Sequence, residues 1–272
     1  MALYDAHNHL QDEKFAGILS HLEREISASR VSGVVINGTR RSDWTAVLAI
    51  AQRNPWAIAS VGYHPWYLDE LPQNWREQFE EFVTLNRVAI GEIGIDGWKP
   101  GLDRNLQREV CAFQLSVAQR NNLPVSIHGL KAWSELLDIL KGIGELPAGF
   151  LLHSYSGDRS YLKPFIERGA YFSCSGAFLE PKRAKTFDLY KEIPIDRLMI
   201  ESDAPDQLPP EAMDTWGLTQ SDSKARLTHP LSVELTYRAL AIARGVELSD
   251  FEVRIEGNFK RLFGAFIQAQ RV

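Results

Sequence analysis

The chain alternates between two patterns of hydrophobic and polar positions. Short hydrophobic runs are typical of strands buried on both faces, and longer segments with a hydrophobic residue every three or four positions are typical of amphipathic helices. The short runs predict strands at residues 3–7, 34–36, 57–61, 88–90, 124–127, 149–152, 170–173 and 197–200. The longer segments predict helices at residues 15–29, 43–53, 74–85, 103–120, 132–140, 159–167 and 182–191.

The order of these segments predicts the fold. Strands and helical segments alternate along the chain, which is typical of parallel strands joined by helical crossovers. Eight such units favour a closed (β/α)8 TIM barrel over an open sheet, because closure removes both sheet edges. No repeat or linker interrupts the sequence, so residues 1–272 are predicted to form a single α/β domain. Residues 204–229, the least regular stretch, are predicted to form a long loop after the eighth strand.

Composition and charge narrow the possible partners. The chain has 272 residues, of which 44% are hydrophobic, enough for one large core. Its formal net charge of −5 gives no general attraction to nucleic acids, so any such contact requires a local basic patch. Cys111 and Cys174 form no Cys-x-x-Cys pair and are expected to be reduced core thiols. We expect a cytoplasmic protein without a membrane segment and find no sign of an obligate protein partner.

Histidines and acidic residues follow the predicted strands at or just beyond their C-terminal ends. The residues concerned are His7, His9, His64, Glu92, His128, His153 and Asp203. In a barrel these strand ends share one mouth, and imidazoles and carboxylates that converge there predict a metal site. His7 and His9, two residues apart on a strand, point to the same side and can bind one ion. Asp5 shares that side, where it either orients a ligand or fills the barrel interior.

A series of short motifs resembles those of one family, the TatD-like metal-dependent hydrolases within the amidohydrolase-type barrels. The resemblance covers the whole chain. The motifs are Asp-Ala-His-Asn-His-Leu at residues 5–10, Gly-Tyr-His-Pro at 62–65, Gly-Glu-Ile-Gly-Ile-Asp at 91–96, Pro-Val-Ser-Ile-His at 124–128, His-Ser-Tyr-Ser-Gly at 153–157 and Glu-Ser-Asp-Ala-Pro at 201–205. Residues 256–264 also match the family and are predicted to form a closing helix that packs against the barrel.

The resemblance implies the roles of the site residues. It implies that His7, His9 and Asp203 bind one divalent ion, that His128 and His153 bind a second, and that Glu92 bridges the two ions. One or two ions are therefore expected, and the ligand types accept zinc, manganese, cobalt, nickel or magnesium. Asp203 is the expected general base, because a carboxylate at the ion can take a proton from water and return it to the leaving group.

Other positions bear on the substrate. The resemblance makes His64 a candidate for substrate binding or leaving-group protonation, beside the alternative of a loop histidine that only bonds to the backbone. The family commonly has a basic residue two positions after His128, whereas here Lys131 stands three positions after it. Asp206 and the His229–Pro230 pair also depart from the family pattern. These differences weaken the expectation that the substrate carries a phosphate.

Three functions fit these observations. The first is a phosphodiesterase that hydrolyses DNA from an end, on a single strand or a frayed duplex, because several TatD-like proteins resemble it in activity. The second is a hydrolase of a small carboxylic ester, lactone or amide, which the same barrel and ions would support. The third is a non-catalytic metal-binding or nucleic-acid-binding module, which the intact set of acids disfavours.

Overall fold

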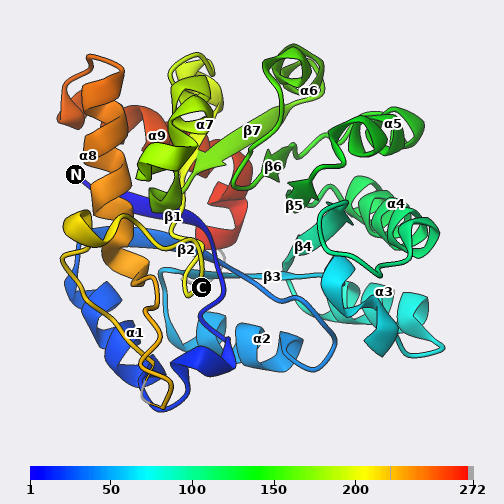
Figure 1. Cartoon of the computed structure of the whole chain (residues 1–272). Coiled ribbons are helices and arrows are strands. Elements are labelled where there is room, and N and C mark those ends of the chain that lie inside the picture. The colour runs from blue at the N-terminus through cyan, green and yellow to red at the C-terminus, as the bar shows by residue number, and fades with distance from the viewer. Residues whose placement is uncertain (221, 269–272) are drawn as a thin grey trace.

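The computed structural model describes residues 1–220 and 222–268, and its centre is an eight-stranded parallel sheet (Figure 1). Each strand pairs with the next one along the chain, so the sheet order is the sequence order. The strands are β1 (Leu3–Asn8), β2 (Val31–Asn37), β3 (Ala57–Val61), β4 (Ala89–Asp96), β5 (Val125–Leu130), β6 (Phe150–Leu152), β7 (Ala170–Cys174) and β8 (Leu198–Ile200). This arrangement confirms the predicted (β/α)8 barrel.

Helices surround the sheet and return the chain between its strands (Figure 1). The α-helices are α1 (Leu19–Ala28), α2 (Trp44–Arg53), α3 (Trp75–Leu85), α4 (Arg104–Asn121), α5 (Trp133–Ile143), α6 (Leu162–Ile166), α7 (Ala184–Tyr190), α8 (Val233–Ala243) and α9 (Leu248–Gln268). The 3-10 helices are η1 (Glu13–Phe15), η2 (Pro65–Glu70), η3 (Arg159–Tyr161), η4 (Gly176–Leu179), η5 (Pro181–Arg183), η6 (Ile195–Arg197), η7 (Glu211–Met213) and η8 (Pro230–Ser232). No helix within the described residues is both long and apolar enough to span a membrane.

Backbone hydrogen bonds just beyond β8 draw the first and last strands together. The amide of Asp203 donates to the carbonyl of His7 at 2.9 Å, and the amide of His9 donates to the carbonyl of Ala204 at 2.7 Å. The Asp5 carboxylate adds to this seam by accepting from the Ser202 amide at 2.9 Å and the Ser202 hydroxyl at 2.6 Å. The seam therefore fixes Asp203 beside the two histidines of β1.

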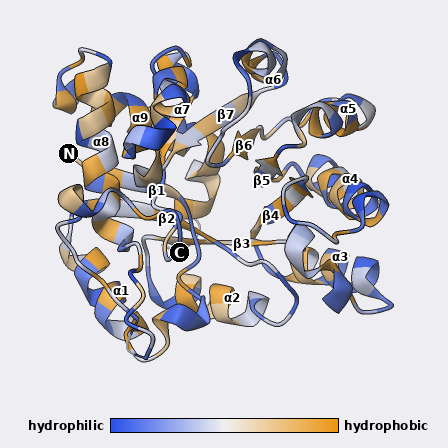
Figure 2. Cartoon of the chain, viewed as in Figure 1, coloured by the Kyte–Doolittle hydropathy of each residue, from blue (hydrophilic) through white to orange (hydrophobic). Residues whose placement is uncertain are grey.

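The hydrophobic core has two parts. One part joins strand residues that range in size from Ala6 to Tyr4 with side chains of α9, among them Phe259 and Phe263. The other part lies between the strands and the surrounding helices. Figure 2 shows the strands as largely hydrophobic, whereas the helices alternate between hydrophobic and hydrophilic residues, as expected for elements with one buried side. The helix predicted at 256–264 is thus confirmed, although α9 is longer than predicted.

Local signals explain where the longest crossover begins and ends. The side chain of Asp103 accepts hydrogen bonds from the amides of Asn105 and Leu106, at 2.9 and 3.1 Å, and so caps the start of α4. Asn122 follows α4 with a left-handed φ of 51°, a conformation that ends many helices. The helix predicted at 103–120 differs from α4 by one residue at each end.

Several predicted boundaries were wrong: among them, the fifth strand runs to Leu130 rather than ending at 127, and the first helix starts at Leu19 rather than at 15. The second strand starts at Val31 rather than at 34, and the fourth runs to Asp96 rather than ending at 90. Glu92 therefore lies inside β4 instead of after it. The prediction stopped short because glycines at 91 and 94 weaken a strand pattern. No helix was predicted over 233–243, where α8 forms. The 204–229 stretch was predicted correctly as irregular: its described residues contain only η7 and one isolated bridge between Thr219 and Arg226.

Candidate metal centre

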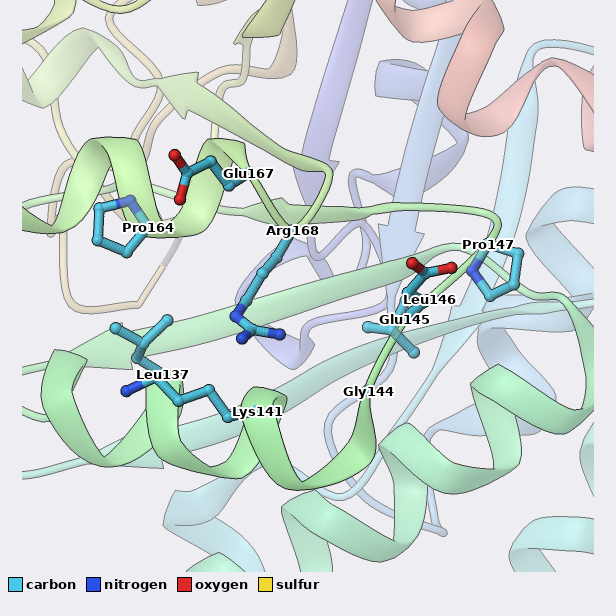
Figure 3. Close-up of a pocket in the computed structure, with 9 residues that line it drawn as sticks. All are labelled: Leu137, Lys141, Gly144, Glu145, Leu146, Pro147, Pro164, Glu167 and Arg168. Carbon is cyan, nitrogen blue, oxygen red and sulfur yellow. The ribbon is translucent and has the colours of Figure 1, made fainter.

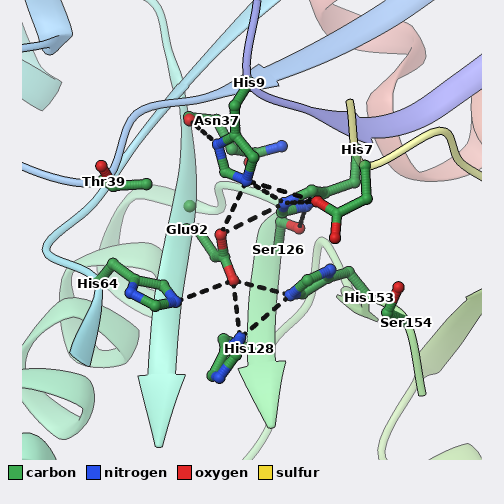
Figure 4. Close-up of polar contacts among 12 residues, drawn as sticks. His7, His9, Asn37, Thr39, His64, Glu92, Ser126, His128, His153 and Ser154 are labelled. Carbon is green, nitrogen blue, oxygen red and sulfur yellow. Dashed lines mark hydrogen bonds and ion pairs between the residues drawn. The ribbon is translucent and has the colours of Figure 1, made fainter. Parts of the chain in front are cut away.

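The strands bring the predicted site residues together at one end of the barrel (Figure 4). They come from widely separated parts of the chain, and all but His9 and His128 are buried. The residues in this cluster are His7 from β1, His9 just after it, His64 after β3, Glu92 from β4, His128 from β5, His153 just after β6 and Asp203 after β8. Asp203 has a left-handed φ of 52°, an uncommon conformation for a residue other than glycine that is concentrated at functional sites.

Glu92 lies at the centre of the cluster, and its two carboxylate oxygens face different groups. Oε2 is 3.4 Å from Nε2 of His7 and 3.2 Å from Nε2 of His9. Oε1 is 3.2 Å from Nε2 of His64, 3.0 Å from Nδ1 of His128 and 2.7 Å from Nε2 of His153. A carboxylate in this position can contact two cations at once.

The first group matches the ligand spacing of a tetrahedral metal ion. Nε2 of His7, Nε2 of His9, Oε2 of Glu92 and Oδ1 of Asp203 make five contacts of 3.2 to 3.6 Å with one another. Tetrahedral ligands bound about 2.0–2.2 Å from a zinc ion lie about 3.3–3.6 Å apart. These residues therefore fit a divalent ion.

The second group is more compact. Nε2 of His153 lies 3.4 Å from Nδ1 of His128, and both atoms face Oε1 of Glu92. His64, Glu92 and His128 also present ligand atoms close enough to share an ion. Two overlapping sets of donors thus meet at Glu92.

Hydrogen bonds on the outer nitrogens aim the rings of His7 and His9. Nδ1 of His9 is 2.7 Å from the carbonyl oxygen of Asn37, which can only accept, so Nδ1 carries the hydrogen. In the neutral ring, Nε2 then directs its lone pair at the cluster. Nδ1 of His7 bonds to the hydroxyl of Ser126 at 2.7 Å. Burial and the nearby His153 lower the pKa of His7 to about 3, which keeps the ring neutral, the form that binds metal.

Asp96 orients His128 in the same way. Its Oδ2 lies 2.9 Å from Nε2 of His128 and also accepts from the indole nitrogen of Trp66 at 2.7 Å. Burial alone would raise the pKa of Asp96, but these bonds and the amide of Lys99 hold it below its usual value. Asp96 is therefore ionised, and Nδ1 of His128 is left free to face Glu92. No role was predicted for Asp96, although it belongs to the motif at residues 91–96 and lies four positions after Glu92, a spacing that places two strand residues on the same side.

The carboxylates make the cluster attract positive charge. Burial disfavours a charged His153, yet Glu92 outweighs burial and raises the pKa of His153 to about 9. Burial is likewise outweighed at His9, where Asp203 and Glu92 raise the pKa. A divalent cation bound here would take the place of those protons.

A further buried carboxylate, Glu201, lies next to His153. It accepts hydrogen bonds from the hydroxyl of Ser154 at 2.5 Å and from the hydroxyl of Ser173, and it lies 3.9 Å from Nδ1 of His153. Burial raises the pKa of Glu201 to about 7. The prediction missed this residue, for which the available signal was an acid inside a hydrophobic run two positions before Asp203.

His64 differs from the other imidazoles in its hydrogen bonding. Its Nδ1 accepts from the amide of Trp66 at 3.2 Å, so the hydrogen of the neutral ring is on Nε2. Burial lowers the pKa of His64 to about 4, which favours that neutral form. Nε2 therefore donates to Glu92 rather than offering a lone pair, which suits a hydrogen-bond donor better than a ligand.

Other sequence candidates lie outside the cluster. Asp5 bonds to the amide of His7 and to Asn8 and Ser202, and no bond joins it to an imidazole among the described residues. Lys131 directly follows β5 and is exposed. Asp206 forms an exposed ion pair with Lys14 at 2.7 Å.

His229 lies apart from the cluster too. It stacks on Trp216, with ring centres 4.3 Å apart, and its Nε2 lies 3.1 Å from Glu25. The departures at Asp206 and His229 therefore leave the cluster intact.

Known proteins resemble this chain over nearly its whole length. The family model described as TatD related DNase matches residues 4–264. The uncharacterized metal-dependent hydrolase YabD of Bacillus subtilis (strain 168) is 26% identical over 96% of this chain and 98% of its own length. The 3'-5' ssDNA/RNA exonuclease TatD of Erwinia tasmaniensis is 27% identical over 96% of this chain and 99% of its own.

Solved structures share the fold. The crystal structure of YjjV, a TatD homologue from Escherichia coli K12, superposes with a TM-score of 0.86 at 23% identity and covers 96% of this chain and 98% of its own. A TatD family hydrolase from Entamoeba histolytica superposes with a TM-score of 0.81 at 19% identity and covers 96% of this chain and 98% of its own. The match of the family model over residues 4–264 and the similarity to metal-dependent hydrolases show that the chain belongs to the TatD-related DNase family of metal-dependent hydrolases.

Proposed function

We propose that this protein is a divalent-metal-dependent phosphodiesterase that removes nucleotides from the end of a DNA strand. The observation that carries the proposal is the placement of Glu92, whose two oxygens face two separate groups of donors. Two cations held a short distance apart suit an in-line displacement at phosphorus, because they stabilise both the attacking and the leaving oxygen. A relative named as a 3'-5' ssDNA/RNA exonuclease adds support for the substrate class.

The proposed ligands divide into two sets around Glu92. His7, His9 and Asp203 would hold one ion, His128 and His153 would hold the second, and Glu92 would contribute to both sets. Such ions would supply Lewis acidity that polarises the phosphoryl oxygen and lowers the pKa of water. Zinc, manganese, cobalt, nickel and magnesium all accept such ligands.

The protein side chains perform the proton transfers. Asp203 takes a proton from the attacking water and passes it to the leaving oxygen. Nε2–H of His64 faces the same space and is placed to donate a hydrogen bond to the substrate. Asp96 and the carbonyl of Asn37 keep the rings of His128 and His9 aimed throughout the reaction.

An activity panel tests this function. Protein reconstituted separately with each metal is incubated with single-stranded DNA, a simple phosphodiester, a carboxylic ester and an amide. We expect hydrolysis of both phosphodiesters and little of the other two. Activity on the ester or amide alone would instead identify a small-molecule hydrolase.

A further inference from the structure

A cavity lined in part by basic residues lies next to the metal centre. Its volume is about 350 Å³, and its lining includes Arg40, Arg41, Ser42, Tyr63, Tyr67 and Glu70, which we call the arginine pocket. The pocket is formed by the segments that follow β2 and β3. The same segments border the cluster, because the amide of His64 donates to the carbonyl of Thr39 at 2.8 Å and the ring centre of Tyr67 lies 6.0 Å from that of His64. Figure 4 shows Thr39 and His64 side by side at the edge of the cluster.

Arg41 offers the pocket a positive charge that no acid neutralises directly. Its guanidinium lies 5.4 Å from the ring centres of Trp44 and Phe82, and no carboxylate pairs with it within residues 1–220 and 222–268. These aromatic contacts hold the guanidinium in place while leaving its N–H donors available.

Arg40 supplies a second guanidinium, held more loosely. It lies 4.5 Å from the ring centre of Tyr67 and pairs with Glu70 at 3.1 Å. The side chains of Arg40 and Glu70 are 36% and 48% exposed, and ion pairs this accessible contribute little free energy. An incoming anion can therefore replace Glu70 at small cost.

Two carboxylates that act on Arg40 are those of Glu70 and Asp43. The carboxylate of Asp43 already accepts from the amide and hydroxyl of Thr39, both at 2.9 Å, and from the amide of Arg40 at 3.4 Å. It is thus committed to shaping the loop and does not line the pocket.

Tyr63 provides a second, independent indication of a ligand. The residue is 3% exposed, and its hydroxyl is buried without a hydrogen-bond partner in the described part of the chain. Gln114 holds the Tyr63 backbone through two bonds, of 2.7 and 3.2 Å, so the side chain is fixed in place. Buried hydroxyls in proteins almost always have a partner, and one without a partner in the lining of a pocket that also contains Arg41 is suited to donate to an anion.

We propose that the arginine pocket binds a phosphate group of the substrate, distinct from the phosphate that is cut. Arg41 and the Tyr63 hydroxyl donate to its oxygens, and Arg40 joins them after leaving Glu70. The binding chemistry stands on the pocket alone. Only the source of the phosphate, a neighbouring position on a nucleic-acid strand, rests on the proposed function.

Another cavity lacks these features. It has a volume of about 430 Å³ and lies between the ends of α5 and α6 (Figure 3). Its lining residues 144–147 precede β6, so it lies at the end of the barrel away from the metal centre. There Lys141 and Arg168 are accompanied by Glu145 and Glu167, so its charges are mixed, and no polar side-chain atom of its lining is both buried and unpartnered.

Calorimetric titration of inorganic phosphate into the metal-loaded protein tests the pocket. We expect Arg41→Gln to weaken phosphate binding about tenfold, the effect of losing one charged hydrogen bond. Tyr63→Phe should also weaken binding but leave the melting temperature unchanged or higher, because the hydroxyl has no partner to lose. Glu70→Gln should tighten binding by releasing Arg40. Phosphate bound at the metal centre would give a separate event that none of these variants alters. Equal affinity in all four proteins would overturn the proposal.

Kinetics on two substrates test the source of the phosphate. One substrate is a single-stranded oligonucleotide, and the other is bis(p-nitrophenyl) phosphate, which has only one phosphate. We expect Arg41→Gln to lower kcat/KM about tenfold on the oligonucleotide, mainly through KM, and to leave the simple diester unaffected. An equal effect on both substrates, or on neither, would overturn the placement of a strand phosphate in the pocket. If wild-type protein cleaves no phosphodiester, the proposed function fails, while the titration still decides whether the pocket binds phosphate.

Discussion

At the scale of single residues, the chemistry of the cluster depends on which nitrogen of each imidazole faces inward. His9 and His128 both have an acceptor on the outer nitrogen, a carbonyl in one case and the Asp96 carboxylate in the other. His64 has a donor there instead. The same side chain is therefore held in two different tautomers: those of His9 and His128 are suited to bind a metal, and that of His64 is suited to donate a hydrogen bond.

Asp203→Asn tests the general base. The substitution keeps the shape of the side chain but removes its basicity, so we expect the protein to fold, to retain at least one ion and to lose at least about 100-fold in kcat. Asp206→Asn is the matched control, because Asp206 is an exposed carboxylate three positions away whose ion pair is with Lys14 at the surface. Melting temperature and metal content confirm the fold. Wild-type turnover by Asp203→Asn would remove Asp203 from the proton transfer.

Glu92→Gln tests the bridge. The amide offers one neutral oxygen where two charged ones faced the two groups, so we expect occupancy by two ions to fall to one or fewer at a metal concentration that saturates the wild type. Elemental analysis after gel filtration measures the stoichiometry. Glu77→Gln, the same substitution at an exposed position on α3, is the control. Unchanged stoichiometry and affinity would contradict bridging.

The sequence predicted the members of this cluster far better than their partners. His7, Glu92 and Asp203 were found because acids and imidazoles follow a predicted strand. Asn37 acts through its backbone carbonyl, which no side-chain pattern reveals. Ser126 has a residue type too common to single out, and it can be assigned only once the barrel is closed and β5 faces β1 across its interior.

At the scale of elements, the long strand β4 and its contact with β5 position the centre of the site. Gly94 lies between Glu92 and Asp96, with a φ of 148° that side chains rarely adopt. A Cβ atom added there would lie 2.0 Å from the carbonyl oxygen of His128. The glycine that made β4 hard to predict is thus what allows two ligand-bearing strands to pack closely.

Gly94→Ala is expected to lower the free energy of unfolding by at least about 2 kcal/mol, from backbone strain and the clash with His128. Urea unfolding of the metal-free protein measures this without a contribution from ion binding. Gly142→Ala in α5 is the matched control: its Cβ would meet nothing within 4 Å, so it should stabilise by about 0.5–1 kcal/mol. The same urea midpoint for Gly94→Ala and wild type would show that β4 and β5 accommodate the added methyl group without a steric cost.

Some parts of the fold were predicted from the sequence and others were missed. The number, order and parallel direction of the strands could be predicted because each hydrophobic run is buried on both faces. The helix α8 was missed although a local signal was available. Its buried residues recur at helical spacing, and they are Val233, Thr236, Tyr237, Leu240 and Ala241.

At the scale of the whole molecule, the site lies at a barrel end and the chain carries a net charge of −5. In the proposed function, a scissile phosphate has to reach residues set at the strand ends, which a flexible end does more easily than a stiff duplex. The net negative charge gives a duplex no general attraction, so duplex binding should be weak, and the contacts that Lys and Arg side chains make with phosphates should weaken with added salt. Cleavage is therefore expected to follow the accessibility of strand ends.

Three DNA substrates measure this dependence: a 5'-labelled single strand, a blunt duplex and a closed circular single strand. With metal-loaded protein we expect rapid loss of nucleotides from the linear single strand, slow cutting of the duplex and none of the circle. The circle is also the control for contaminating endonuclease. Rapid cutting of the circle by protein whose Asp203→Asn variant is inactive would exclude an enzyme that requires an end.

The seam between β1 and β8 also bears on when the proposed ions can be bound as the chain is made on the ribosome. His7 and His9 are synthesised long before Asp203, which reaches them only through backbone bonds formed after β8 has been made. Until then the nascent chain presents an incomplete set of donors and has little power to retain a metal. Metal loading should therefore follow barrel closure, so the ion is taken up by a nearly finished barrel and does not guide its early folding.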